Sequence, residues 1–444
     1  MGKKLYTKRD ISKAKTEWLG IPELVVLKSG SDDTHLEVVH RRYFEGEKLP
    51  CPACQSLKTR CSKIVNRKIK DLLWLDDSHK KFQIIDLLFH QRYLRCDNCG
   101  QSVFSEPTEF GEKGCRFTNR LSDVLADGTF QFSYKKVCQH YGVPASTASV
   151  GEIMRRRIRY RESLLPQIRT PHILSIVEVL FFGEIYPIIL GVWDGEVYCL
   201  DVLPDSSEET CGAFLKILDA KQVETVYVDP VDSLFNVVNQ YFPMSSIVVT
   251  DEAIQRYARN AMLDIIHCDG KRFPVVHKER RLTVLRKDLD DKILIPRIKE
   301  GMKSRPRLKQ AYDHHQRLLE LMETKWSIDE LRAWAEQIPA EVDEFFMVGD
   351  VIDVFDEQLS DFLLLSEKPP NNYQFAVQGI CDAIKDMPHC IFDVMRGRCI
   401  FSITHDTVEE NGELWQYGIK SSRLIEKINE ISANIREERE YGYQ

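Results

Sequence analysis

Residues 173–202 read ILSIVEVLFFGEIYPIILGVWDGEVYCLDV, and this stretch predicts three consecutive strands. We expect the strands at residues 173–182, 186–193 and 196–202, because these runs are rich in β-branched, aromatic and other apolar residues. Asp194-Gly195 separates the second and third runs, and this dipeptide favours a two-residue hairpin turn. Three antiparallel strands therefore open this part of the chain.

The pattern then changes to helices that alternate with short apolar strands. Helices are expected at residues 208–218 and 234–241, with a third beginning at Glu252, and strands at residues 225–228 and 246–250. Short apolar runs between helices fit parallel strands that are buried on both faces. Three antiparallel strands followed by α-β-α-β-α form the element order of an RNase H-like α/β fold.

An aspartate follows each of the two short strands, Asp229 and Asp251. In such a fold, carboxylates at strand ends can hold two divalent metals for phosphodiester chemistry. An Asp after a strand more often caps a helix, so both uses stay open for these residues.

Four of the 13 cysteines form two C-x-x-C pairs, Cys51-Pro-Ala-Cys54 and Cys96-Asp-Asn-Cys99. Two intervening residues let a tight turn present both thiolates to one zinc ion. A strand-like stretch at residues 81–95 runs into the second pair, and Gly100 after it can take a positive φ. We expect a zinc ribbon whose closed four-thiolate site is structural, with free thiols or a redox pair as the alternative.

The other nine cysteines are scattered, and burial as small hydrophobic residues is the favoured interpretation. They are Cys61, Cys115, Cys138, Cys199, Cys211, Cys268, Cys381, Cys390 and Cys399.

Residues 134–155 predict a helix that ends near Gly142, a tight turn, and a second helix that begins near Pro144–Ser146. This pattern is typical of a helix-turn-helix, although a plain helical hairpin has the same pattern. In a helix-turn-helix, the start of the second helix lies in a DNA major groove and a basic end contacts phosphates. The candidate groove contacts are Ser146, Thr147 and Ser149, and the candidate phosphate contacts are Arg155, Arg156, Arg157 and Arg159.

Charge is unevenly distributed along the 444 residues. Residues 1–170 carry 31 Lys+Arg and 20 Asp+Glu, a net of +11, whereas the whole chain has a net charge of −7, which leaves −18 for the remainder. A basic first third suggests a module that binds a polyanion, and an uneven solvated surface is the alternative. No run of 18 uncharged apolar residues occurs and the N-terminus has no apolar signal segment, so we expect no membrane span and a cytoplasmic location.

With these pieces in order, the chain resembles the ISL-type transposases of bacterial insertion sequences from about Trp18 to about Phe401. The resemblance rests on both cysteine pairs and on four further motifs. These motifs are Val226-Tyr-Val-Asp229, Phe242-Pro-Met-Ser-Ser-Ile-Val-Val-Thr-Asp251, Arg305-Pro-Arg-Leu-Lys-Gln-Ala-Tyr312 and Gln378-Gly-Ile-Cys-Asp-Ala-Ile-Lys385. It implies a multidomain α/β protein with a zinc ribbon, a helix-turn-helix and a DDE-type RNase H-like domain interrupted by a helical insertion.

The resemblance also implies three catalytic acids, of which one matches. The second acid of the family is Asp229, whereas Val177 stands at the first position and Gln378 at the third. The family motif Asp-x-Phe-His reads Asp251-Glu-Ala-Ile254 here. Valine cannot ligate a cation, and glutamine is a neutral and weaker ligand for Mg²⁺. The resemblance therefore predicts a decayed nuclease centre.

Three nearby acids could replace the lost ligands. Glu178 should point to the opposite sheet face from Val177, because successive strand residues alternate. Asp382 lies about one helical turn after Gln378, and Asp251 could join Asp229 in a weak single-metal site. An active Mg²⁺-dependent transposase with a shifted acid set is thus the alternative function.

The leading hypothesis is a sequence-specific DNA-binding protein derived from such a transposase and catalytically inactive, which acts in DNA targeting, transposition or regulation. Its expected partners are double-stranded DNA and either a second copy or a larger DNA-processing assembly, and its expected cofactor is structural Zn. A scaffold that no longer binds DNA is the remaining alternative.

The expected division of the chain has six parts. They are a zinc-ribbon domain (1–110), a helix-turn-helix domain (115–165), the first part of an RNase H-like domain (172–262), a helical insertion (263–350), the C-terminal part of the RNase H-like domain (351–410) and a helical tail (411–444). Within the insertion, His314 and His315 are adjacent and point in different directions on a helix, so we expect them at the surface.

Overall fold

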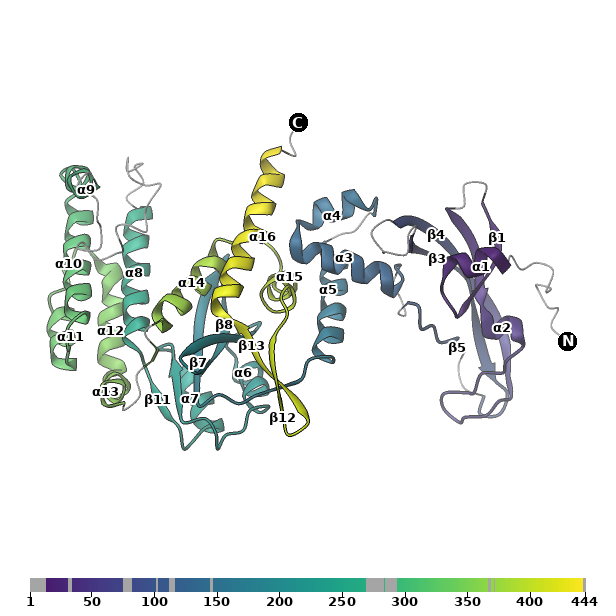
Figure 1. The fold of residues 1–444 in the computed structure, drawn as a ribbon, viewed down its shortest axis with the longest axis horizontal. Coiled ribbons are helices and arrows are strands. Elements are labelled where there is room, and N and C mark those ends of the chain that lie inside the picture. The colour runs from purple at the N-terminus through teal and green to yellow at the C-terminus, as the bar shows by residue number, and fades with distance from the viewer. Residues whose placement is uncertain are drawn as a thin grey trace. The chain divides into compact units, whose positions relative to one another are not determined.

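The computed structural model describes residues 13–30, 34–74, 82–100, 103–111, 116–143, 147–268, 283, 294–365, 369–370 and 372–441. The chain divides into two compact units, residues 1–163 with 437–444 and residues 164–436 (Figure 1). Each unit contains its own sheet and its own buried core.

The sheet of the first unit has the strand order β1-β2-β4-β3, with β5 paired to β4. Its strands are β1 (Leu24–Ser29), β2 (His35–His40), β3 (Thr59–Trp74), β4 (Phe82–Cys96) and β5 (Phe104–Ser105). β3 and β4 form a long antiparallel hairpin, and β2 pairs with β4 in parallel. Ile85, Leu87 and Phe89 alternate along β4 and all point into the core, as the two-residue period of a strand requires.

The helices of the first unit lie before, between and after the strands of this sheet in the sequence. They are α1 (Lys13–Leu19), α2 (Arg41–Glu45), α3 (Asn119–Gln131), α4 (Tyr134–His140) and α5 (Thr147–Glu162). The start of α3 is joined to β3 because the buried carboxylate of Asp71 accepts hydrogen bonds from the Thr118 hydroxyl and from Nε of Arg120, the latter at 2.9 Å. This contact fixes the helices to the sheet of the same unit.

The second unit contains a sheet with the order β11-β10-β7-β8-β9-β13-β12, and β6 pairs with β13. Its strands are β6 (Gln167–Ile168), β7 (Ile173–Phe181), β8 (Glu184–Trp193), β9 (Glu196–Val202), β10 (Thr225–Val228), β11 (Ser246–Val248), β12 (Asp406–Glu410) and β13 (Glu413–Lys420). β7, β8 and β9 are antiparallel neighbours, whereas β10 runs parallel to both β7 and β11. Asp194 and Gly195 both take positive φ in the turn between β8 and β9, as the sequence predicts.

Helices cover both faces of this sheet. On one face, Leu174 and Ile176 of β7 and Val226 and Val228 of β10 pack in one core with residues of α6 (Glu208–Leu215) and α7 (Asp232–Tyr241). On the other face, Tyr373 of α14 (Tyr373–Lys385) bonds the Ser175 hydroxyl at 2.8 Å and lies 5.3 Å from the ring of Tyr227. Alternate residues of β7 therefore face different helices.

Most of the remaining helices lie between β11 and β12 in the sequence. They are α8 (Asp251–Cys268), α9 (Leu294–Met302), α10 (Pro306–Met322), α11 (Ile328–Ala335), α12 (Phe346–Val354), α13 (Asp356–Leu364) and α15 (Phe392–Arg396), together with a 3-10 turn at Asp343–Phe345 and a π-helical turn at Gly397–Phe401. The last helix, α16 (Ser421–Tyr441), follows β13. The described residues of the expected insertion are mostly helical, with turns between the helices, and its expected boundaries stay a prediction.

Three expectations are wrong in this structure. Residues 411–444 are not a wholly helical tail, because Glu413–Lys420 form β13 and pair with β9 at Ile419 and Cys199. His314 and His315 are buried rather than at the surface, because both rings lie against Phe345. Burial of the scattered cysteines holds for Cys199, Cys211, Cys381 and Cys399, but Cys61 and Cys268 are exposed, Cys138 and Cys390 are half-buried, and Cys115 lies outside the described residues.

Candidate functional site

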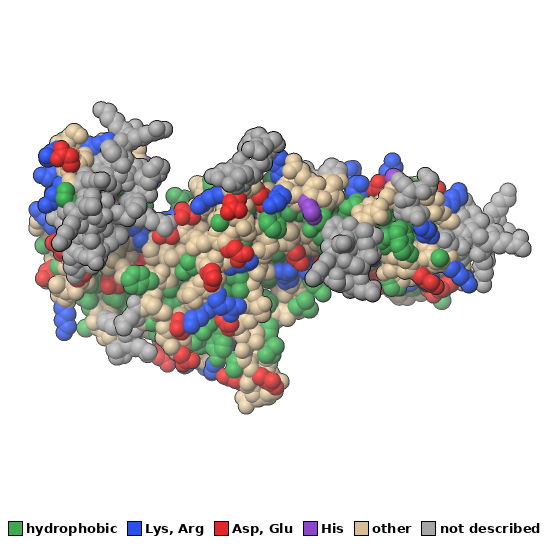
Figure 2. All heavy atoms as spheres, turned by 45° about the horizontal axis from the view of Figure 1, so that its top comes forward, with side chains coloured by type: hydrophobic (Ala, Val, Ile, Leu, Met, Phe, Trp, Pro, Cys, Tyr) green, Lys and Arg blue, Asp and Glu red, His purple; other side chains and the backbone are tan. Residues whose placement is uncertain are grey.

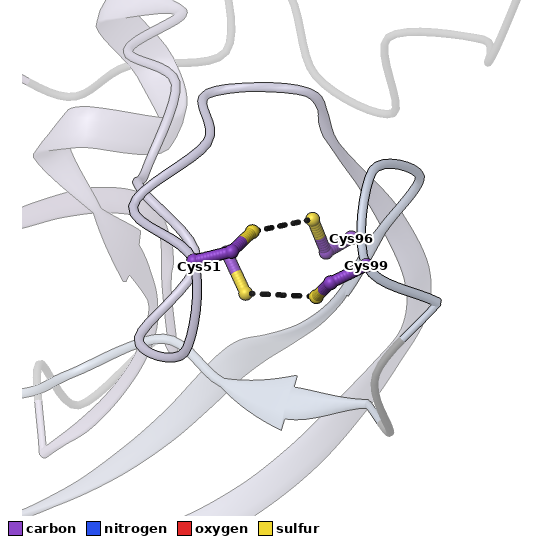
Figure 3. A group of neighbouring side chains, drawn as sticks. Cys51, Cys96 and Cys99 are labelled. Carbon is purple, nitrogen blue, oxygen red and sulfur yellow. Dashed lines mark hydrogen bonds between the residues drawn. The ribbon is translucent and has the colours of Figure 1, made fainter.

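The four paired cysteines converge at one point of the first unit. Sγ of Cys51 lies 3.7 Å from Sγ of Cys99, and Sγ of Cys54 lies 3.6 Å from Sγ of Cys96. All four sulfur atoms lie within 4.8 Å of one another, and Figure 3 shows the thiols pointing toward a common centre. Four sulfurs at about 2.3 Å from a tetrahedral zinc ion are separated by about 3.8 Å, so this arrangement fits zinc.

The local backbone explains why the cysteines meet. The first pair lies in a loop where the amide of Gln55 donates to the carbonyl of Cys51 at 2.8 Å. The second pair begins at the last residue of β4, and Gly100 after it takes φ of 66°, as the sequence predicts. The β3–β4 hairpin spans the residues between the pairs, so forming the hairpin brings the two knuckles together.

Hydrogen bonds favour the thiolate form of Cys54 at this centre. The amide of Asn98 donates to Sγ of Cys96 at 3.4 Å, and its side-chain amide donates to Sγ of Cys54 at 3.8 Å. A backbone hydrogen bond at Ser56 and the Asn98 side chain lower the pKa of Cys54 to about 6. A lowered pKa supplies the deprotonated ligand that zinc requires.

Helix α5, which follows α4 in the sequence, carries the described residues that are expected to contact DNA. Gly142, after α4, takes φ of 61°, which ends that helix where the sequence predicts its end. Val150 and Ile153 of α5 are buried and belong to the inner face of this helix. Ser146 lies outside the described residues, and the described part of Thr147 is its backbone. Ser149 is half-buried at the start of α5.

The four candidate arginines have different surroundings. Arg155 and Arg156 both bond Glu152, at 3.2 and 2.9 Å. Arg157 lies between Asp123 and Asp127 of α3, at 3.2 and 3.3 Å, and its side chain is 15% exposed. Arg159 is exposed, and no ion pair to it is found among the described residues. Arg157 therefore stabilises the α3–α5 contact, while Arg159 is open to a partner.

Asp229, directly after β10, is buried at the centre of the second unit. Its Oδ2 accepts a hydrogen bond from the amide of Glu178 at 2.6 Å, and its Oδ1 accepts one from the guanidinium of Arg256 on α8. The helix that follows, α7, begins after Val231 and has no side-chain cap. Asp229 thus does not serve as the helix cap that is the usual role of an Asp after a strand.

A second buried carboxylate, that of Glu252, is hydrogen-bonded to Arg256. Nε of Arg256 donates to Oε1 of Glu252 at 3.2 Å, and Nη1 donates to the backbone carbonyl of Glu178 at 3.4 Å. The side chains of Arg256 and Glu252 are each 4% exposed, and that of Asp229 is 2% exposed. Burial raises the pKa of Glu252, although the charge of Arg256 opposes that shift.

The resemblance implies two further catalytic positions, at Val177 and Gln378, and the structure brings no other carboxylate into either of them among the described residues. Val177 is buried in β7 and pairs with Ile188 of β8. Glu178 accepts a hydrogen bond from the Ser206 hydroxyl at 2.6 Å, on the side of α6, so it points away from the Val177 position as expected. Gln378 is half-buried on α14, and its Nε2 has no hydrogen-bond partner among the described residues.

A cleft of about 580 Å³ opens above the buried arginine between α8, α10 and α14. Glu252, Arg256 and Gln378 line it, and so do Asp251 and Asp382, the two acids considered as replacement ligands. Oδ1 of Asp251 accepts from the amide of Glu252 at 2.9 Å in the first turn of α8. Among the described residues, the four clustered cysteines have ligand atoms close enough together to hold one metal ion. The acidic residues around Asp229 form no such group within the same described residues.

Charge is mixed on the surface of the second unit. On the face drawn in Figure 2, acidic and basic side chains are interspersed over the middle of the molecule. The acidic excess of the later residues therefore does not form a uniformly negative face on this side.

Sequence reasoning missed Arg256, which balances the charge of Asp229, and Glu252, which bonds the same arginine. Their spacing of four residues on a helix was the available signal, but the same spacing is common in exposed ion pairs. The Arg256–Glu252 pair differs from those exposed pairs in being buried. That burial depends on the packing of α8 in the folded unit, which the local sequence does not show.

Comparison with known families identifies part of the second unit. Residues 192–361 match the family model DDE_Tnp_ISL3, described as transposase. The match runs from β8 into α13 and includes Asp229, whereas Val177 and Gln378 lie outside it. The resemblance to ISL-type transposases is confirmed for this segment. No curated protein matches the chain, and no helix of the described residues is long and apolar enough to cross a membrane.

Proposed function

We propose, from the premise that residues 192–361 form an ISL3-type transposase segment, that the chain is a sequence-specific DNA-binding protein without nuclease activity. It derives from a transposase and acts in DNA targeting, transposition or regulation. The observation that carries this proposal is the ion pair between Asp229 and Arg256, because it removes the retained family acid from metal binding.

Loss of catalysis follows from the charge at this centre. Two-metal phosphodiester chemistry needs several carboxylates that converge on the ions. Val177 and Gln378 supply no negative charge at the other two family positions, and the charge of Asp229 is balanced by Arg256. The residues present therefore do not fit a pair of Mg²⁺ ions.

The order of the large sheet supports an RNase H-like scaffold for this centre. β7, β8 and β9 are antiparallel neighbours, and β10 and β11 extend the sheet in parallel on the other side of β7. The sequence predicts the same strand directions and the same order of these elements along the chain. β13 and β12 lengthen the sheet beyond β9.

DNA binding is proposed for the first unit. Transposases act on DNA, the cysteine cluster fits a structural zinc that would fix the β3–β4 hairpin, and α4 and α5 follow each other across a tight turn. We assign the groove contacts to the start of α5 and phosphate contacts to the exposed Arg155 and Arg159. The net charge of +11 over residues 1–170 favours a polyanionic partner.

The partners proposed beyond DNA are a second copy of the chain or a larger DNA-processing assembly. A decayed nuclease unit that is still folded can serve as a platform for such contacts. Analytical ultracentrifugation of the chain with and without its DNA would measure the oligomeric state.

The experiment that tests the proposal selects bound sequences from a random duplex library and then measures affinity for the recovered site. Cys96→Ser should abolish binding, because the zinc-ordered knuckle is lost, whereas Cys61→Ser should retain it, because Cys61 is exposed on the same hairpin and lies outside the cluster. Affinity should fall as salt rises. Failure to enrich any sequence, even at low salt, would overturn the proposed function.

A further inference from the structure

We propose that the guanidinium of Arg256 is the resident cation of the buried acidic centre, and that it excludes the divalent ions that the transposase resemblance implies there. The inference extends the proposed loss of catalysis. Its test measures cation binding alone, so its failure would leave DNA binding by the first unit unaffected.

Three oxygen atoms converge on this guanidinium from three segments of the chain. They are Oδ1 of Asp229 after β10, Oε1 of Glu252 on α8 and the carbonyl oxygen of Glu178 on β7. Carboxylate and carbonyl oxygens are also the ligands that hard divalent cations take in proteins. The arginine therefore uses a set of donors that would otherwise suit a metal ion.

The centre requires a positive charge because its carboxylates are out of water. An isolated buried carboxylate is strongly unfavourable unless a partner compensates its charge. Although burial opposes it, the charges of Asp229 and Glu252 raise the pKa of Arg256 well above its ordinary value. The guanidinium is thus permanently charged where a cation is needed.

The side chain of Arg256 also lies between the carboxylate of Asp229 and the cleft. Arg256 and Glu252 line the cleft between α8, α10 and α14, whereas Asp229 does not. An ion entering from the cleft would have to displace the guanidinium from a buried carboxylate. Removing the guanidinium opens that path and leaves the three oxygens facing the vacated volume.

Arg256→Ala should therefore create a divalent-cation site that the native chain lacks. We would titrate the zinc-loaded full-length chain with Mn²⁺ and follow free Mn²⁺ by electron paramagnetic resonance. Arg256→Ala is expected to bind one more Mn²⁺ per chain than the native protein, and adding Asp229→Asn should abolish the gain. The matched control is Arg259→Ala, which removes a guanidinium from the same helix and the same cleft and should gain no ion.

Thermal unfolding keeps the test decisive if Arg256→Ala folds poorly. Arg256→Gln retains much of the side-chain volume without the charge, and Mn²⁺ should raise the unfolding temperature of both variants but not that of Arg259→Ala. Folding only in the presence of Mn²⁺ would support the inference. Two results would overturn it: no response of either variant to Mn²⁺, or Mn²⁺ binding by the native chain that Asp229→Asn removes.

Discussion

The guanidinium of Arg256 donates a hydrogen bond to the carboxylate of Asp229, and both side chains are buried beneath a cleft in the second unit. The resemblance to transposases implies that this aspartate binds metal, whereas here it balances the charge of an arginine. Under the proposed function, the carboxylate of Asp229 has a structural role.

Asp229→Asn should destabilise the second unit by about 3–5 kcal/mol, the usual cost of leaving a buried ion without its partner. Urea unfolding of the full-length chain would measure the effect. Asp232→Asn is the control, because Asp232 is exposed at the start of α7 and should change stability by less than about 1 kcal/mol. In a metal-dependent site the carboxylates repel one another when no metal is bound, so unchanged or increased stability of Asp229→Asn would contradict the structural role.

The cysteine cluster predicts one tightly bound zinc per chain. Metal analysis of the purified protein should give a ratio near one, and Cys51→Ser should lose the metal because a four-thiolate site then lacks a ligand. Circular dichroism should report the loss of structure after chelation, since metal binding contributes directly to folding. Cys61→Ser should keep the zinc, and loss of zinc from that variant would place the metal elsewhere.

Truncation of two arginines on α5 should affect different properties, DNA affinity for Arg159 and thermal stability for Arg157. Arg159→Ala should weaken DNA binding and reduce the slope of log affinity against log salt by about 1, with unchanged stability, because Arg159 is exposed and available to a phosphate. Arg157→Ala should lower the unfolding temperature, because it loses its contacts with Asp123 and Asp127. Anisotropy titrations and thermal unfolding of both variants test this pair. An unchanged salt slope for Arg159→Ala would remove it from the interface.

Two buried histidines should make the second unit sensitive to acid. Burial lowers the pKa of His314 from 6.5 to about 4 and that of His315 to about 3. The unfolded chain therefore binds more protons than the folded chain below pH 6.5, and stability falls as the pH drops toward 4. Each histidine should contribute up to about 1.4 kcal/mol of this loss per pH unit.

Urea unfolding at pH 7 and pH 5 would measure that dependence. His315→Leu should reduce the difference in unfolding free energy between the two pH values by about 2 kcal/mol. Leu318→Ala is the control, because it removes a buried side chain from the same helix but no titratable group, so the difference should stay unchanged. An unaltered difference in His315→Leu would show that His315 does not titrate in this way.

The features that the sequence predicted well are local ones. The C-x-x-C spacing indicated the cysteine cluster, and the apolar runs with Asp194-Gly195 located β7, β8 and β9 to within two residues. Gly142 marked the end of α4 because few other residues adopt a positive φ at low cost. In each case the determining residues lie within a few positions of one another.

The features that were missed depend on contacts between distant segments. β13 completes the large sheet by pairing Ile419 with Cys199, and the local pattern of residues 413–420 does not contain that pairing. His314 and His315 are adjacent on α10, yet Phe345 approaches both rings and they are buried. The residues near Arg256 in the sequence give no indication of its partner Asp229, which lies 27 positions earlier.

The central claim is that this chain binds DNA at a specific sequence and does not cut it. The most direct measurement incubates the full-length chain, in buffer containing Mg²⁺, with the duplex recovered by selection, and resolves bound, free and cleaved DNA on gels. We predict a retarded complex in which both strands remain intact, with the same result when Mn²⁺ replaces Mg²⁺. Metal-dependent nicking or strand transfer that Asp229→Ala abolishes would contradict the account.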